Sequence, residues 1–152
     1  MLHRIEMLFN RILNEDENQK LDAHEIEIAS AALLVHCAKV DGEQSAQETT
    51  YLRSILAERY HLSSDEIDSV IEAAEARERE AIDLHRFTRV LHQSLDRDGR
   101  IHMVQMLWEI ADADGHIDSD ERRMVSLTAH LLDVEVHDAV AARQAAQAKR
   151  DV

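Results

Sequence analysis

A short acidic pattern that occurs twice constrains the fold of this chain more than any other feature. An Asp-Gly pair closes an apolar, helix-like stretch, and a Glu follows seven residues after the Asp (48 − 41), at Asp41-Gly42…Glu48 and again at Asp114-Gly115…Glu121. At an offset of 73 residues (114 − 41), several apolar positions also become identical: Ile28/Ile101, Leu34/Leu107 and Ala38/Ala111. Two copies indicate an internal duplication, since a solenoid requires about three or more units. We predict two pseudo-symmetric helix–acidic turn–helix repeats.

The composition favours helices throughout. The 152 residues include no proline, three glycines and only 3% aromatic side chains. A multi-stranded sheet normally needs more turn residues and more β-branched and aromatic side chains than this. We therefore predict an all-α fold, a single domain of about seven helices. The helical domain is expected over residues 21–150, preceded at residues 1–20 by an amphipathic helix and a polar linker.

Capping boxes mark where several of these helices begin. In such a box a Ser, Thr, Asp or Asn is followed three residues later by Glu or Gln, and each side chain accepts a hydrogen bond from the other residue's backbone N–H. Four segments fit this pattern: Asp22–Glu25, Ser45–Glu48, Ser63–Glu66 and Asp118–Glu121. With Asp83 as a further cap and a turn at residues 96–99, the expected helices cover about 22–39, 45–60, 63–80, 83–95, 100–113, 118–132 and 136–150.

The first segment carries one apolar stripe. Its apolar residues recur at spacings of three and four: Leu2, Ile5, Leu8, Phe9, Ile12 and Leu13. Such a helix either packs on its own domain or binds a membrane surface or a partner. The polar face has little excess of Lys and Arg, which a membrane-surface helix normally carries. We therefore expect this helix to pack on its own domain.

The charge and the cysteine count exclude several function classes. The formal net charge is −14, from 31 acidic and 17 basic side chains, and such a field repels phosphate backbones. We therefore expect no nucleic-acid partner. Cys37 is the single cysteine, so there is no disulfide framework, and its apolar surroundings predict a buried thiol. No apolar run reaches the length of a membrane span and no signal peptide is evident, so we expect a cytoplasmic protein without membrane insertion.

The acidic turns allow two interpretations. Helix termination and helix capping explain much of the pattern. The glycines suit the end of one helix, and Ser45 and Asp118 can cap the next one, with each cap stabilising its helix by about 0.5–2 kcal/mol. Carboxylates at the last turn of a helix are instead disfavoured, by about 0.3–1 kcal/mol each. A divalent cation would relieve that crowding. The candidate metal ligands are Asp112, Asp114, Asp118 and Glu121 in the second copy, with Asp41 and Glu48 in the first.

Other site chemistry is weakly represented. The second copy is similar to a calcium-binding EF-hand loop, but Ile110 stands where that loop needs its first acidic ligand. Glu58 and His61 form one Glu-x-x-His, whereas a di-iron bundle needs two such pairs and two further Glu. No phosphate-binding glycine loop is present. We expect a protein that is not an enzyme.

The combined motifs resemble the TerB family of tellurite-resistance proteins. In the second copy the matching residues are Leu107 through Gly115, Ile117-Asp118, Glu121 and Leu131 through Val134; in the first they are Val40-Asp41-Gly42, Glu48 and His61-Leu62-Ser63. The resemblance covers about residues 22–150. It implies an all-α domain of about seven helices, acidic residues that bind a metal cation, and a role in metal or chemical stress response beside membrane-associated complexes. The first copy departs from the second at Lys39 and Gln44, opposite Asp112 and Ile117.

Two functions follow as hypotheses. The first is a non-enzymatic module that binds a divalent cation (Ca, Mg or Mn) at the acidic turns and acts in stress response with a protein partner. The alternative is a metal-independent scaffold whose acidic surface docks a basic protein and whose capping boxes serve only the helices.

Overall fold

The computed structural model describes residues 2–13, 20–38, 46–78, 84–113, 115, 117 and 119–150. Within this part of the chain all regular structure is α-helical, as predicted. The helices are α1 (Leu2–Leu13), α2 (Ala23–Ala38), α3 (Ala46–Glu58), α4 (Ser64–Glu78), α5 (Leu84–Ser94), α6 (Arg97–Ala111), α7 (Ser119–Leu131) and α8 (Val136–Arg150). The bounds of α3 and α7 differ by the repeat offset at both ends (119 − 46 and 131 − 58).

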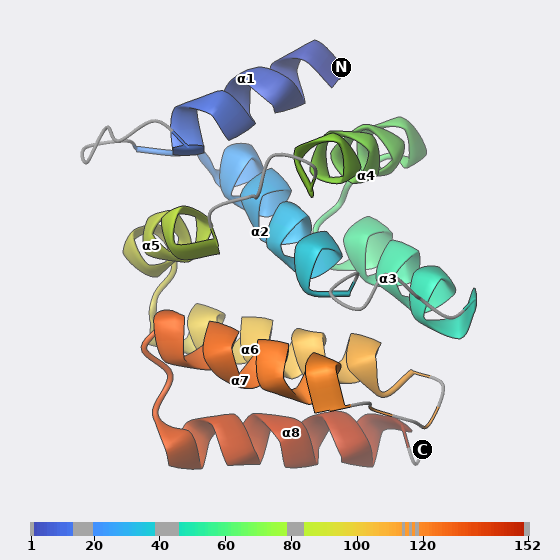
Figure 1. Cartoon of the computed structure of the whole chain (residues 1–152), viewed down its shortest axis with the longest axis vertical. Helices are drawn as coiled ribbons and strands as arrows, with labels where there is room; N and C mark the ends of the chain where they lie inside the picture. The colour runs from blue at the N-terminus through green and yellow to red at the C-terminus, as the bar shows by residue number, and fades with distance from the viewer. Residues whose placement is uncertain are drawn as a thin grey trace.

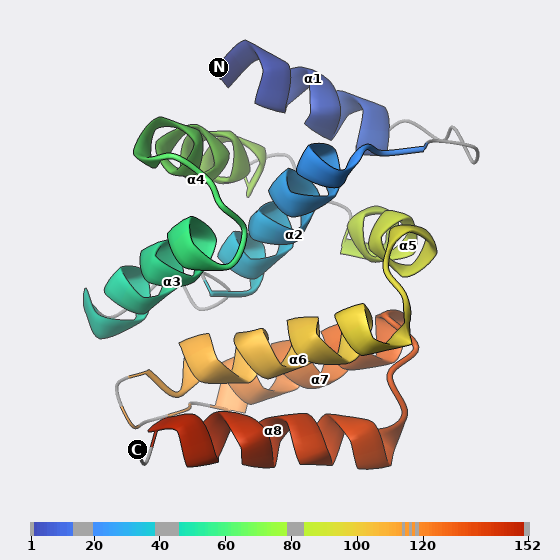
Figure 2. The ribbon, with the colours of Figure 1, turned by 180° about the vertical axis from the view of Figure 1, so that it is seen from behind.

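The helices form two stacked groups. In Figures 1 and 2, α1 to α5 occupy one half of the molecule, and α6, α7 and α8 run nearly side by side in the other. Helix α2 lies at the centre (Figure 1) and packs against α1, α3, α4, α5, α6 and α7. Helix α6 packs along α8 and against α7, α2 and α3. The two central helices of the repeats, α2 and α6, therefore meet in the interior.

The middle of helix α2 is buried around its whole circumference. Every residue from Ile28 to Val35 is buried, including Ser30. This follows from the sequence, since the segment is Ala-, Leu- and Val-rich without an alternating polar face, and a helix that is apolar all round belongs in a core. The burial of this segment is therefore not confined to one face of the helix.

Helix α1 packs on the rest of the protein through its apolar stripe, as expected. Ile5, Leu8, Phe9 and Ile12 are all buried. The ring of Phe9 meets Phe87 of α5 edge to face, with the centroids 5.4 Å apart. Burial of such side chains stabilises the fold by about 1.5–3 kcal/mol each. The division of the chain between residues 20 and 21 stays a prediction.

The two capping boxes that the structure describes form as predicted, and one helix begins at a different residue from the one predicted. Oδ1 of Asp22 accepts from the Glu25 N–H at 2.7 Å, and the Ser63 hydroxyl accepts from the Glu66 N–H at 3.1 Å. Residues 96–99 were expected as a turn before the sixth helix. Instead α6 begins at Arg97, because Oδ1 of Asp96 accepts from the N–H of Gly99 at 2.7 Å and caps the helix. Within the described residues, no helix has the length and apolar character to cross a membrane.

Candidate functional site

Three of the six predicted metal ligands lie in the described part of the chain, and all three are buried. Glu48, Asp112 and Glu121 expose 3%, 6% and 5% of their surface. Asp41, Asp114 and Asp118 fall outside the described residues. Carboxylates are rarely buried to this degree, because leaving water penalises the charged form unless protein groups or an ion compensate it. Burial therefore sets these three apart from the exposed acidic side chains that give the protein its charge.

The fold brings Glu48 and Glu121 to one cavity. Both lie in the first turn of their helices, α3 and α7, at the position that a capping box assigns to its Glu. The cavity measures about 10 Å³, close to the space of one water molecule. Its walls are mostly repeat-equivalent pairs from the two halves: Leu34 with Leu107, Cys37 with Ile110 and Ala38 with Ala111, together with Val125. Equivalent residues of the two repeats thus converge on the same point.

Asp112 occupies a different position from the two glutamates. It is the C-cap of α6, and its backbone N–H donates to the carbonyl of Trp108 at 3.0 Å. Its own carbonyl accepts from Gly115 at 3.0 Å, and Gly115 has a φ of 82°, the left-handed value expected for a residue that ends a helix. Asp112 is not among the described residues that line the cavity. The structure therefore joins Glu48 with Glu121 and leaves Asp112 at the neighbouring turn.

A fourth buried carboxylate is neutralised by the protein itself. The carboxylate of Glu109 is held by Arg59, the residue after α3, through two hydrogen bonds of 2.8 and 3.2 Å, and by Lys149 of α8 at 3.1 Å. The Tyr51 hydroxyl donates to it at 3.2 Å. The sequence placed Glu109 in an apolar run but gave no sign of these partners, which come from other helices. One of the carboxylates near the second acidic turn is therefore neutralised by cationic side chains of the protein, without a metal ion.

Cys37 lies beside the cavity as a protonated thiol. It is buried, its Sγ lies 3.5 Å from the Thr128 hydroxyl, and burial raises its pKa to about 11. A thiolate would be needed to bind a soft metal ion, and at neutral pH this thiol is not ionised. The predicted burial of Cys37 is confirmed, and the donors at this point are carboxylate oxygens.

One group of three ligand-type side chains is compact among the described residues. Atoms of Glu135, His137 and Asp138 at the start of α8 lie within 4.8 Å of one another. Glu135 and His137 are exposed, and Asp138 is paired with Arg97 at 2.7 Å. Exposed ion pairs of this kind are common on protein surfaces and contribute little. This cluster is explained by ion pairing.

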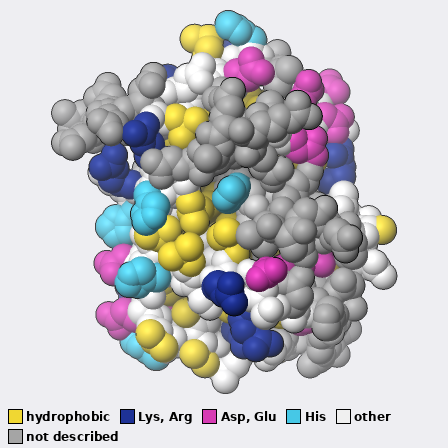
Figure 3. Space-filling view, in the orientation of Figure 1, with side chains coloured by type: hydrophobic (Ala, Val, Ile, Leu, Met, Phe, Trp, Pro, Cys, Tyr) yellow, Lys and Arg dark blue, Asp and Glu magenta, His cyan; other side chains and the backbone are white. Residues whose placement is uncertain are grey.

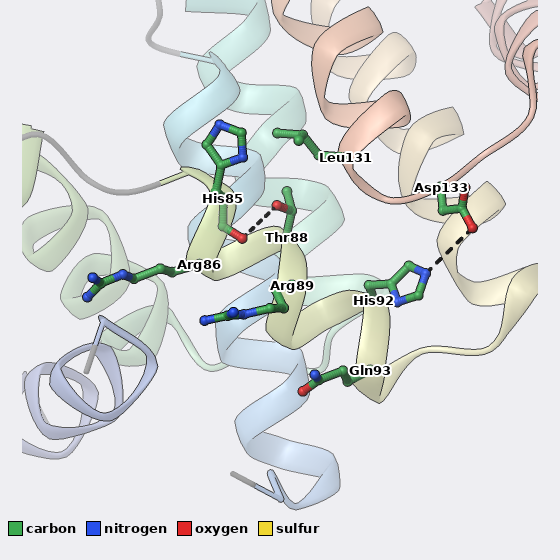
Figure 4. Close-up of a pocket in the computed structure, with 8 residues that line it drawn as sticks. All are labelled: His85, Arg86, Thr88, Arg89, His92, Gln93, Leu131 and Asp133. Atoms are coloured by element: carbon green, nitrogen blue, oxygen red, sulfur yellow. Dashed lines mark hydrogen bonds and ion pairs between the residues drawn. The ribbon is translucent and has the colours of Figure 1, made fainter. Parts of the chain in front are cut away.

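A basic groove of about 580 Å³ lies along α5 (Figure 4). Arg86 and Arg89 extend to the same side, while the imidazole of His92 faces Asp133 at 3.8 Å. The Thr88 hydroxyl donates to backbone carbonyls of its own helix, so it is not prepared as a nucleophile. The groove provides positive charge, but its described residues contain no nucleophile–base pair. Its lining residues are His85, Arg86, Thr88, Arg89, His92, Gln93, Leu131 and Asp133.

Comparison with known families agrees with this architecture. The family model described as tellurite resistance protein TerB matches residues 27–144, which include both acidic turns and most of the helical repeats. No curated protein and no solved structure matches the chain. The match covers most of the sequence, and the fold is all-helical as that family's is. The chain therefore belongs to the TerB family.

Proposed function

We propose that this TerB-family protein is a non-enzymatic helical module that binds a divalent cation through the carboxylates of its inter-helix turns. One observation carries the proposal: Glu48 and Glu121, equivalent in the two repeats and both buried, line a single cavity. The metal- or chemical-stress role, the cytoplasmic location and a protein partner within a membrane-associated complex belong to the same proposal.

The donor chemistry fits a hard cation. Ca²⁺, Mg²⁺ and Mn²⁺ take carboxylate, carbonyl and water oxygens as ligands. Glu48 and Glu121 would each supply carboxylate oxygen from the start of a helix, and Asp41, Asp112, Asp114 and Asp118 belong to the adjoining turns. The protonated Cys37 thiol beside them argues against a soft metal ion.

The metal-independent scaffold remains the second candidate, because of Glu109. That carboxylate is as deeply buried as Glu121, yet Arg59 and Lys149 neutralise it. A buried carboxylate in this fold can thus be compensated within the protein. In the scaffold model the turns only cap helices, and the net charge of −14 serves to attract a basic partner surface.

Calorimetric titration of chelator-stripped protein with Ca²⁺, Mg²⁺ and Mn²⁺ separates the two models. We expect one of these ions to bind, and Glu48→Gln and Glu121→Gln each to weaken its binding at least about tenfold, the loss of about 1.4 kcal/mol. At an ion concentration of 100 times the Kd, binding should stabilise the fold by about 2.7 kcal/mol.

Glu135→Gln is the matched control. It removes the same charge from the exposed cluster at the start of α8, and we expect it to leave the affinity unchanged. Melting temperatures that do not respond to EDTA or to any of the three ions would refute cation binding and favour the scaffold. Binding that only Glu135→Gln weakens would place the ion at the exposed cluster and refute the proposed site.

A further inference from the structure

The surface between α7 and α8 combines apolar and cationic groups in a way that the acidic turns do not explain. A groove of about 280 Å³ runs there, above the indole of Trp108 from α6. Val136 and Val140 of α8 stand on its wall with 80% and 51% of their surface exposed. Figure 3 shows hydrophobic side chains beside Lys and Arg side chains over this part of the molecule. Exposed apolar side chains next to a groove indicate a binding surface more often than isolated ones do.

The charge of the groove is opposite to that of the protein. Arg122, His130 and Arg143 line it, and none of its described lining residues is Asp or Glu. The chain as a whole carries 31 acidic side chains against 17 basic ones. Because the described lining is cationic and apolar and contains no carboxylate, it is complementary to an occupant that carries a negative charge next to an apolar group.

Two buried donors on residues that line the groove have no hydrogen-bond partner among the described residues. They are Nε1 of Trp108, whose residue is only 5% exposed, and Nε of Arg143. The Arg143 guanidinium lies over the Trp108 ring, 4.9 Å from the ring centroid, so the cation is positioned by the aromatic floor. A buried N–H without an acceptor costs about 1–3 kcal/mol.

The dimensions favour a protein segment over a small molecule. Pockets for small molecules usually enclose about 300–1,000 Å³ and bury most of the ligand. This groove lies at the lower end of that range, and the exposure of Val136 and Val140 shows that it is open along one side. Trp and Arg are also the side chains most enriched among residues that dominate protein interfaces. A second copy of this chain is disfavoured as the occupant, because two molecules of charge −14 repel each other.

We propose that the groove between α7 and α8 docks a segment of a partner protein in which an aliphatic side chain stands next to a carboxylate. The aliphatic side chain packs against Val136 and Val140. The carboxylate pairs with Arg122 and Arg143 at the two sides of the groove. This inference is independent of cation binding, since none of its residues belongs to the acidic turns.

Selection from a random peptide library on the purified full-length protein tests the chemistry. We expect the enriched peptides to share an aliphatic residue followed or preceded by Asp or Glu. The enriched peptide is then synthesised, and its binding is followed by the fluorescence of Trp108, which is the single tryptophan. A version with Asn or Gln in place of its acidic residues should bind about tenfold more weakly, as expected for one lost charged contact.

Paired variants identify the groove. We expect Arg122→Gln to weaken peptide binding about tenfold, whereas Arg123→Gln, an equal charge change on an exposed neighbour outside the lining, leaves it unchanged. Val140→Asp should abolish binding. Leu127→Asp, the same change at an exposed apolar position of α7 outside the lining, should not. The four substitutions are at exposed positions, so the variants are expected to fold.

Several results would overturn the proposal. These are a selection without a shared motif, a neutral or basic consensus, or peptide binding that Arg122→Gln and Val140→Asp leave intact. Recruitment to vesicles of anionic lipid without peptide binding would instead assign the surface to a membrane. The peptide-binding experiments do not depend on cation binding, so this proposal and the proposed function can be refuted separately.

Discussion

Removing the charge of Glu109 tests whether the interior depends on its buried ion network. Glu109→Gln keeps the shape of the side chain and removes the negative charge that Arg59 and Lys149 share. The network joins α3, α6 and α8, so its loss affects contacts between both halves of the molecule. The Tyr51 hydroxyl can still donate to the amide oxygen, so the substitution mainly removes the ionic contribution.

The expected loss of stability follows from how deeply each partner is buried. The Glu109 side chain is 2% exposed, the Arg59 side chain 22% and the Lys149 side chain 50%. Breaking a fully buried pair by removing one partner costs about 3–5 kcal/mol. Because Lys149 can turn to water and Arg59 is partly solvated, we expect a smaller loss of about 2–3 kcal/mol. In a domain of this size that corresponds to a drop in melting temperature of about 5–10 °C.

Urea unfolding followed by circular dichroism measures this change. Glu135→Gln, the same chemical change at an exposed position, should alter the free energy of unfolding by less than about 0.5 kcal/mol. A double-mutant cycle of Glu109→Gln with Arg59→Gln should give a coupling energy of about 1–2 kcal/mol. A loss below about 1 kcal/mol for Glu109→Gln, or a coupling near zero, would show that the network behaves as a surface ion pair and that our reasoning from burial is wrong.

Three further predictions concern single side chains. Cys37, with a pKa raised to about 11 by burial, should react with a thiol reagent at pH 8 only after denaturant is added; rapid labelling of the native protein would contradict its packing. The hydrogen bond that Nε2 of His24 donates to the Glu66 carboxylate at 2.6 Å raises the pKa of His24. This pair therefore stabilises the fold fully below the ordinary His pKa of 6.5 and loses its effect as pH rises through the folded value. An NMR titration should find the His24 pKa above 6.5 and returned towards that value in Glu66→Gln; a His24 pKa at or below 6.5 would refute the contact. Asp96→Ala should lower the free energy of unfolding by about 1 kcal/mol through loss of the α6 cap, and Asp96→Ser, which restores an acceptor, should recover most of it, whereas equal losses in both would rule out capping.

The helix ends were predictable from sequence because they are set by local chemistry. Asp22 and Ser63 cap their helices through contacts three residues away, and such contacts are visible in the order of the residues. The start of α6 was misplaced because the pattern of residues 96–99 also fits a turn. The apolar stripe of the first segment likewise predicted a packed helix, since its period defines one face.

The extent of burial was less predictable. The apolar composition of α2 places it in the core, but the sequence does not show which helices cover residues Ile28 to Val35, all of which are buried. The reason is that six other helices contact α2, and the number of neighbours of a helix is decided by the whole fold. The neutralisation of Glu109 was equally unpredictable, because its compensating charges lie 50 and 40 residues away in the chain (109 − 59 and 149 − 109).

The sequence by itself determined the helical class, the family resemblance and the equivalence of Glu48 with Glu121. These rest on composition, periodicity and repeat spacing, which are properties of the chain order. Only the tertiary structure decided that the two glutamates face one cavity, that Glu109 is neutralised by Arg59 and Lys149, and that Arg122, Arg143 and Val140 share a groove. These contacts depend on how helices that are distant in the sequence pack together, and no local sequence pattern specifies that packing.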